Sequence, residues 1–209
     1  MDIGLVFSFL GASILLTLMP GPDNLFVLTE SITKGQKNGI SISIGLCLGV
    51  LVHTLAAATG LSIIIQQSAL AFSIIKYLGA AYLFYLAYLS MKEGQPTLDF
   101  NSSTISEPFN IFPLIRKGFF MNVLNPKVSL FFIAFLPQFI TNNSMNITVQ
   151  MIVLGIIFMI QAIIIFSLIA ILSSRLTSFV NNPKFWKITK WSKVLVLFIL
   201  GLTLALSSK

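Results

Sequence analysis

Residues 19–24 read Met-Pro-Gly-Pro-Asp-Asn and lie inside an apolar stretch that runs from residue 3 to residue 28. Two prolines around a glycine remove a backbone donor and clash with the preceding turn, so we expect the helix to be interrupted here. An irregular backbone at membrane depth is tolerated only where it is buried in protein or lines a watery cavity. If a second half-helix begins at Pro22, its free N–H groups and positive dipole end lie at Asp23 and Asn24. The stretch therefore predicts a broken membrane helix with a polar site beside the break.

The rest of the chain has the composition of a membrane protein. Of its 209 residues, 56% are hydrophobic and only 9% are charged, and the mean hydropathy is +0.94. A soluble domain carries about 25% charged residues. A spanning helix needs about 20 apolar residues. Six stretches reach or approach that length: 3–28, 40–65, 68–91, 118–140, 147–172 and 194–206. The last is long enough only if Trp191 and the stems of Lys190 and Lys193 extend it. We predict an all-α membrane protein with six transmembrane helices in a single integral membrane domain, 1–209.

The fourth stretch holds a counterpart of the first break, because residues 122–127 read Asn-Val-Leu-Asn-Pro-Lys. Lys127 lies near mid-bilayer, where inserting a lysine costs at least about 2.5–3.5 kcal/mol. We therefore expect Lys127 to have an interaction partner or a functional role. The two broken helices are the first of two three-helix halves, 1–92 and 111–209. A break in the first helix of each half is typical of a transporter built from inverted repeats, with its site between the breaks. We therefore predict two inverted three-helix repeats.

Basic residues predict the orientation. Ten of the thirteen lysines and arginines lie in the connections after the first, third and fifth stretches, and the other connections between stretches hold none. Basic connections remain in the cytoplasm. The polar linker 93–110 is then cytoplasmic and both termini are outside. The formal charge of +7 is explained by this pattern and does not indicate a nucleic-acid partner.

Further polar residues lie at the depth of the two breaks. One acid, one amine and several amides form an amphoteric set that matches a zwitterion: the acid suits an ammonium group, and the amine suits a carboxylate. Three other interpretations stay open. In the first, Asp23 and Lys127 pair directly as a structural salt bridge. In the second, His53 is a packed helix residue rather than a proton relay. In the third, the amides serve only to hold helices together. The predicted substrate-binding or proton-coupling residues are Pro20, Gly21, Pro22, Asp23, Asn24, His53, Asn122, Asn125, Pro126, Lys127 and Gln161.

Several classes of chemistry are excluded. The chain has one cysteine and one histidine, which leaves no internal disulfide, no dithiol pair and no histidine-based metal cluster. No phosphate-binding loop suggests ATP as an energy source. We predict no metal, no cofactor and no enzymatic activity. Energy must then come from a gradient, with Asp23 as the first candidate proton carrier and His53 as the second.

Motifs spread over nearly the whole chain resemble those of the LysE/RhtB family of small amino-acid exporters. Each is short, but they share order and spacing: residues 20–24, 34–39, 45–49, 76–83, 118–127, 131–132 and 136–139. The resemblance implies export of amino acids or close derivatives across a bacterial inner membrane by secondary transport driven by protons, without an organic cofactor. One intramembrane acid favours a neutral substrate. The implied partners are the amino-acid substrate, protons and the lipid bilayer, and a homodimer stays open. The alternative is a passive small-solute channel, which would share the broken helices but not the gradient dependence.

Overall fold

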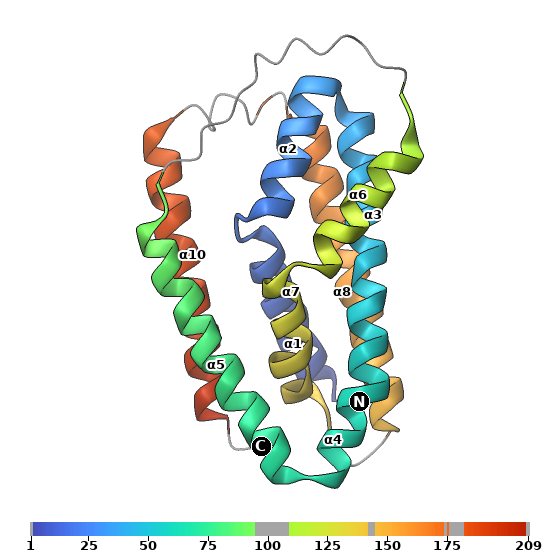
Figure 1. Ribbon diagram of the computed structural model, residues 1–209, viewed down its shortest axis with the longest axis vertical. Coiled ribbons are helices and arrows are strands. Elements are labelled where there is room, and N and C mark those ends of the chain that lie inside the picture. The colour runs from blue at the N-terminus through green and yellow to red at the C-terminus, as the bar shows by residue number, and fades with distance from the viewer. Residues whose placement is uncertain (1, 95–108, 142–144, 174, 176–181, 208–209) are drawn as a thin grey trace.

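The computed structural model describes residues 2–94, 109–141, 145–173, 175 and 182–207. Helix is the only regular structure in these residues (Figure 1). In chain order the elements are α1 (Ile3–Leu18), α2 (Pro22–Lys34), α3 (Gln36–Ala56), π-helical η1 (Ala57–Leu61), α4 (Ser62–Gln67), α5 (Ala69–Lys92), α6 (Ile111–Val123), α7 (Pro126–Leu130), π-helical η2 (Phe131–Phe135), 3-10 η3 (Leu136–Phe139), α8 (Ile147–Ile171) and α10 (Pro183–Leu206).

Both predicted breaks are confirmed. α1 and α2 meet at an angle of 57°, and α6 meets the segment from Pro126 to Phe139 at 50°. Pro22 and Pro126 each occupy the first turn of the helix that follows the break, where the N–H that proline lacks would have had no partner. Among the described residues, four helices are long and apolar enough to cross a membrane, and six spans result if each bent pair counts as one. The protein is therefore an all-α membrane protein.

Two span boundaries differ from the prediction because helices continue beyond the apolar stretch. The last span was expected at 194–206, but α10 begins at Pro183 and has 24 residues, with Asn182 capping its start. The fourth span was expected from 118, but α6 begins at Ile111. The amine of Lys117, an exposed residue, lies 4.0 Å from the centre of the Phe26 ring on α2, so its charge is held against an aromatic face of another helix.

Successive spans alternate in direction, and the start of α1 and the end of α10 lie at the same end of the molecule (Figure 1). The three spans of the first half therefore run opposite to their counterparts in the second. The repeat relation between 1–92 and 111–209 stays a prediction, and the linker 93–110 falls almost entirely outside the described residues.

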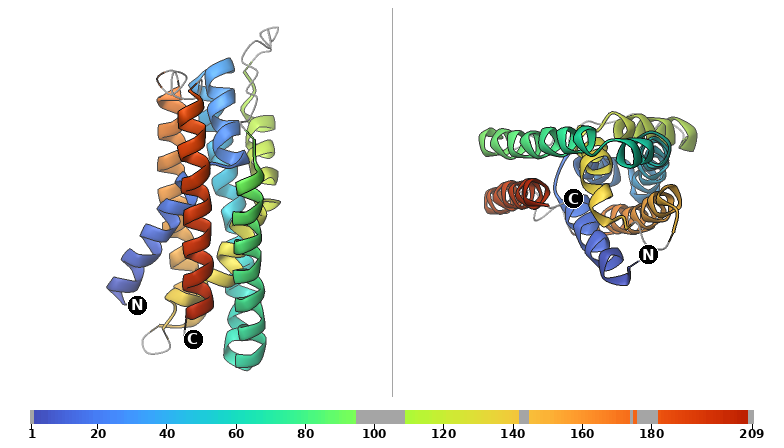
Figure 2. Two further views of the ribbon diagram at one scale, coloured as in Figure 1. Left: turned by 90° about the vertical axis from the view of Figure 1, so that its left-hand side faces the viewer. Right: turned by 90° about the horizontal axis from the view of Figure 1, so that it is seen from below.

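The two predicted halves do not pack as separate bodies. α3 packs against α6 and α8, and α5 packs against α10, so the most extensive helix contacts join the two halves. Viewed along the bundle, α5 and α10 lie together at one side (Figure 2). We call α5 with α10 the arm, and the other four spans the core.

Glycines bring α3 and α6 into close contact. A Cβ added to Gly45 would overlap the backbone carbonyl of Ile115, and one added to Gly118 would overlap that of Ile42. A Cβ on Gly49 would lie 2.7 Å from the Cβ of Asn122. The crossing therefore sets the position of Asn122 beside the second break.

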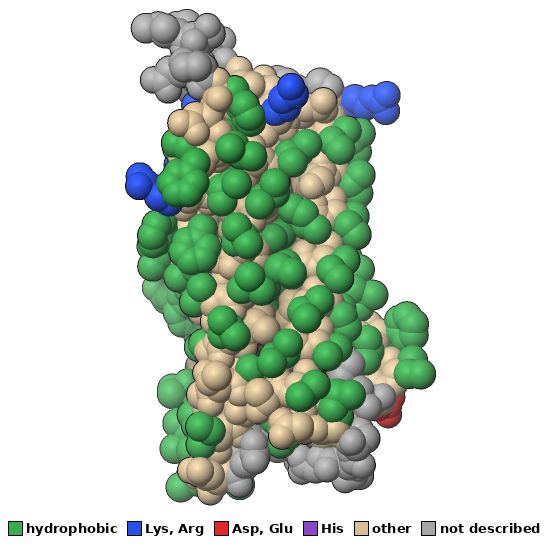
Figure 3. All heavy atoms as spheres, turned by 90° about the vertical axis from the view of Figure 1, so that its right-hand side faces the viewer, with side chains coloured by type: hydrophobic (Ala, Val, Ile, Leu, Met, Phe, Trp, Pro, Cys, Tyr) green, Lys and Arg blue, Asp and Glu red, His purple; other side chains and the backbone are tan. Residues whose placement is uncertain are grey.

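The face shown in Figure 3 is apolar over most of its height, and the lysines and arginines on it gather toward one end. Large apolar side chains along the spans, such as Phe7, Leu70 and Leu124, are 67%, 73% and 76% exposed. An apolar surface of this extent is suited to lipid.

Candidate functional site

The first break places an acid and an amide inside the protein. Gly21 caps α2 without a side-chain hydrogen bond, and Asp23 and Asn24 follow in the first turn. Both side chains are buried, with Asp23 only 3% exposed. Asn24 Nδ2 donates to the carbonyl oxygen of Thr17 at 2.8 Å, so the amide ties α2 back to the last turn of α1.

The second break supplies the partner of that acid. Asn125 caps α7, where its Oδ1 accepts from the backbone N–H of Lys127 at 3.0 Å. Its Nδ2 donates to Asp23 Oδ2 at 2.7 Å. Asn125 thereby connects two segments 102 residues apart in the chain.

Lys127 makes the reciprocal connection. Its amine donates to the carbonyl oxygens of Leu16 at 3.1 Å and Met19 at 3.2 Å, two of the acceptors left free where α1 ends. A cation is favoured at the negative end of a helix dipole. The residues described contain no Asp23–Lys127 contact short enough for an ion pair, so the direct bridge is absent from this structure.

His53, Asn122 and Gln161 surround the same region. His53 Nε2 lies 3.1 Å from the backbone oxygen of Asn122, at the end of α6. Gln161 Nε2 donates to Thr17 Oγ1 at 2.9 Å, which links α8 to α1. Thr17 therefore accepts two side-chain hydrogen bonds, one from Asn24 on its carbonyl oxygen and one from Gln161 on its hydroxyl. Thr17 was not among the predicted site residues, although its position one turn before Pro20 makes it a neighbour of the break.

Three buried amide oxygens have no hydrogen-bond partner among the described residues. They are Asn24 Oδ1, Asn122 Oδ1 and Gln161 Oε1, on side chains that are 8%, 2% and 7% exposed. A buried polar atom without a partner costs about 1–3 kcal/mol. An ammonium group has three donors and no acceptor. The region around the breaks therefore has spare acceptors of the kind that a ligand ammonium or water satisfies.

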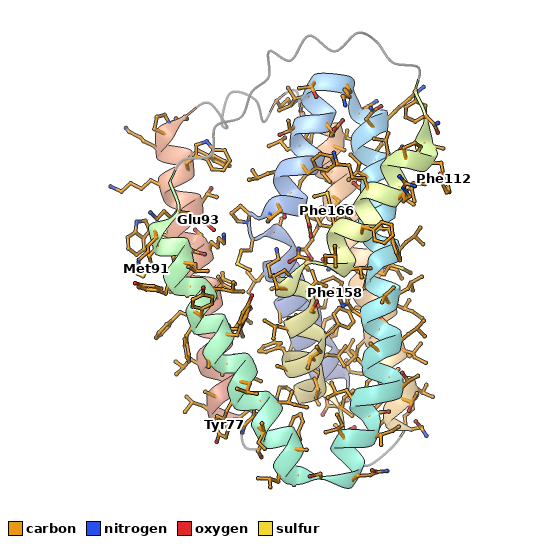
Figure 4. The ribbon with its side chains drawn as sticks, viewed as in Figure 1. Tyr77, Met91, Glu93, Phe112, Phe158 and Phe166 are labelled. Carbon is orange, nitrogen blue, oxygen red and sulfur yellow. The ribbon has the colours of Figure 1, made fainter. Side chains whose placement is uncertain are left out.

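A cavity of about 600 Å³ extends from the first break to the part of the arm where α5 ends and α10 begins. Its walls include Pro20–Pro22 on one side, and Glu93, Trp186, Trp191 and lysines of α10 on the other. Figure 4 shows Glu93 at the end of α5, beside α10. The amine of Lys127 lies 3.6 Å from where a Cβ of Gly21 would stand, so the cavity reaches the predicted site. The sequence had placed Glu93 in the linker, and the lysines of α10 had been assigned to orientation and, for Lys190 and Lys193, to extending the last span, with no role in a site.

Comparison with known proteins gives one family. The sequence pattern of the LysE type translocator family matches residues 14–208. An uncharacterized membrane protein of Vibrio cholerae is 29% identical over 100% of this chain and 98% of its own length. The uncharacterized membrane protein YrhP of Bacillus subtilis is 30% identical over 97% and 99%. A protein of Salmonella typhimurium named homoserine/homoserine lactone efflux protein is 29% identical over 85% and 84%. No solved structure matches the chain.

Proposed function

Because this chain belongs to the LysE type translocator family, we propose that it is a secondary active exporter of amino acids or close derivatives, driven by proton antiport. The family is one of translocators rather than enzymes. The name of the Salmonella typhimurium relative, homoserine/homoserine lactone efflux protein, favours a small neutral amino acid of that kind as the substrate.

The reciprocal contact between the two breaks carries the proposal. Asp23 binds Asn125, and Lys127 binds the end of α1, so an acid and an amine lie together between two interrupted helices. A substrate ammonium would be held by Asp23 and the unpartnered amide oxygens. Its carboxylate would be held by Lys127, whose amine would turn from backbone carbonyls to the stronger acceptor.

The same acid accounts for coupling. A protonated Asp23 loses the charge that attracts an ammonium, so proton and substrate compete for it. A proton entering from outside would release the substrate there, and its departure to the cytoplasm would restore the carboxylate for the next substrate molecule. Competition for one group is sufficient for exchange of one proton for one substrate.

The basic end of the molecule would face the cytoplasm by the positive-inside rule, with both termini outside a bacterial inner membrane. The cavity extends from the first break toward the basic start of α10, so in that orientation this conformation would give access from the cytoplasm. Since the packing joins helices of both halves, we infer that the arm moves against the core, rather than one half against the other.

Accumulation against a gradient tests this function. Proteoliposomes with an interior 1.5 pH units more acidic than the outside, and with the membrane potential clamped, should take up labelled homoserine to a roughly 30-fold excess for one proton per substrate. An uncoupler should abolish the excess. Equilibration to equal concentrations, with or without an uncoupler, would instead identify a passive channel.

His53 offers a separate test of the proton path. His53→Phe removes the hydrogen bond to the backbone oxygen of Asn122 but keeps a ring against Phe132, whose centroid lies 5.8 Å away. Asn122 O still accepts from Asn125 N at 2.9 Å, so we expect a loss of about 1 kcal/mol in stability and retained proton-driven accumulation. Loss of accumulation in a variant that still exchanges substrate would make His53 the proton carrier instead.

A further inference from the structure

The cavity contains an ion pair that is not part of the break. Lys193 Nζ lies 2.6 Å from Glu93 Oε1 and 2.8 Å from Oε2, so one amine binds both oxygens of the carboxylate. Lys190 Nζ donates to the backbone oxygen of the same residue at 2.8 Å. Two lysines of α10 therefore converge on the residue that caps the end of α5, and all three residues line the cavity.

The pair is unequal in its exposure. The Lys193 side chain is only 16% exposed, whereas that of Glu93 is 52% exposed. The Lys193 side chain therefore lies within the cavity wall, and the Glu93 carboxylate binds it from a more exposed position. Lys187 also lines the cavity, so the described lining is net positive. Such a wall attracts carboxylates and repels cations.

The cavity continues from this wall to the predicted binding site. Gly21 lines it, and the amine of Lys127 lies directly behind Gly21. A carboxylate leaving Lys193 therefore has a second amine ahead of it, deeper in the protein.

We propose that Lys190 and Lys193 form a first binding site for the carboxylate of the substrate, and that Glu93 occupies this site when no substrate is present. The inference rests on the proposed export from the cytoplasm. The substrate carboxylate replaces that of Glu93 on the Lys193 amine, so this lysine has a carboxylate partner in both states. This exchange selects substrates that carry a carboxylate, such as homoserine, over homoserine lactone, in which that group is an ester.

Binding can be measured without transport, because the only two tryptophans of the chain, Trp186 and Trp191, both line the cavity. Titrating homoserine into the purified protein in detergent should change the tryptophan fluorescence and saturate. Lys193→Gln should weaken this binding by about tenfold, since it removes a charge-assisted contact. Glu93→Gln should strengthen it severalfold, since the competing carboxylate is gone. Higher salt should weaken homoserine binding to the wild type.

Lys184→Gln is the matched control, since it removes the same charge from α10 at a position that does not line the cavity. It should leave homoserine binding within twofold. Homoserine lactone should bind at least tenfold more weakly than homoserine, with little response to Glu93→Gln. Absence of a fluorescence change with homoserine, or equal losses in Lys184→Gln and Lys193→Gln, would overturn the inference. Because the readout does not need a gradient, a failure to accumulate substrate in proteoliposomes counts against the proposed function and not against this site.

Discussion

Asp23→Asn is expected to abolish proton-driven accumulation of substrate without unfolding the protein. The asparagine oxygen can still accept the hydrogen bond that Asn125 Nδ2 now donates to Asp23 Oδ2 at 2.7 Å, so the contact between the breaks survives. The negative charge does not survive. A hydrogen bond to a charged group is worth about 1.5–3 kcal/mol, which corresponds to roughly a 10- to 150-fold loss of affinity for a substrate ammonium.

Two assays separate the two roles assigned to Asp23. Exchange of labelled for unlabelled homoserine at equal pH reports substrate binding, and accumulation under a pH gradient reports coupling. A variant that exchanges but does not accumulate has lost only the proton carrier, and one that does neither has also lost the ammonium site. Glu30→Gln is the control, because Glu30 is a second buried acid on α2, 8% exposed, that pairs with Lys34 at 3.2 Å away from the break. Wild-type accumulation in Asp23→Asn would contradict both roles.

The sequence predicts the broken helices because the cause is local. Proline interrupts a helix wherever it lies in the interior, and hydropathy reports how deep the interruption sits. The predicted depth of each residue within its apolar stretch also placed Asp23, Asn125, Lys127 and Gln161 at one level of the membrane. All of them lie around the breaks in the structure, although their roles stay a proposal.

The sequence could not identify which partner each residue has. Depth gives the position along the membrane normal but not the lateral neighbour, so Asp23 was considered as a partner for Lys127 and instead binds Asn125. Backbone acceptors carry no sequence signal, and the binding of Lys127 to the end of α1 was invisible for that reason. Glu93 was read as linker because it lies beyond the apolar stretch, where hydropathy no longer indicates what the residue contacts.

The second large effect is expected at the crossing of α3 and α6. Gly45→Ala would drive a methyl group into the carbonyl of Ile115 and to 2.9 Å from the backbone nitrogen of Phe119. The overlapping atoms belong to the backbone and cannot move away by a change of rotamer, so the two helices must separate. We expect a loss of about 3 kcal/mol in the free energy of unfolding, which is the upper end of the usual range for overpacking. Transport should fall as well, because the crossing positions the end of α6, where Asn122 and the second break lie.

Denaturation of the purified variants in detergent measures this effect, and two comparisons make it specific. Gly11→Ala is the control, because a Cβ at this α1 position meets nothing within 4 Å, and it should gain about 0.5–1 kcal/mol from helix propensity. Gly118→Ala enters the same crossing from the other helix, against Ile42 and Leu46. Once the helices have separated to accommodate one methyl group, a second methyl group at the same crossing causes less overlap. The double variant should therefore lose less free energy of unfolding than the two single variants together. Equal stability of Gly45→Ala and Gly11→Ala would mean that this crossing does not fix the position of the second break.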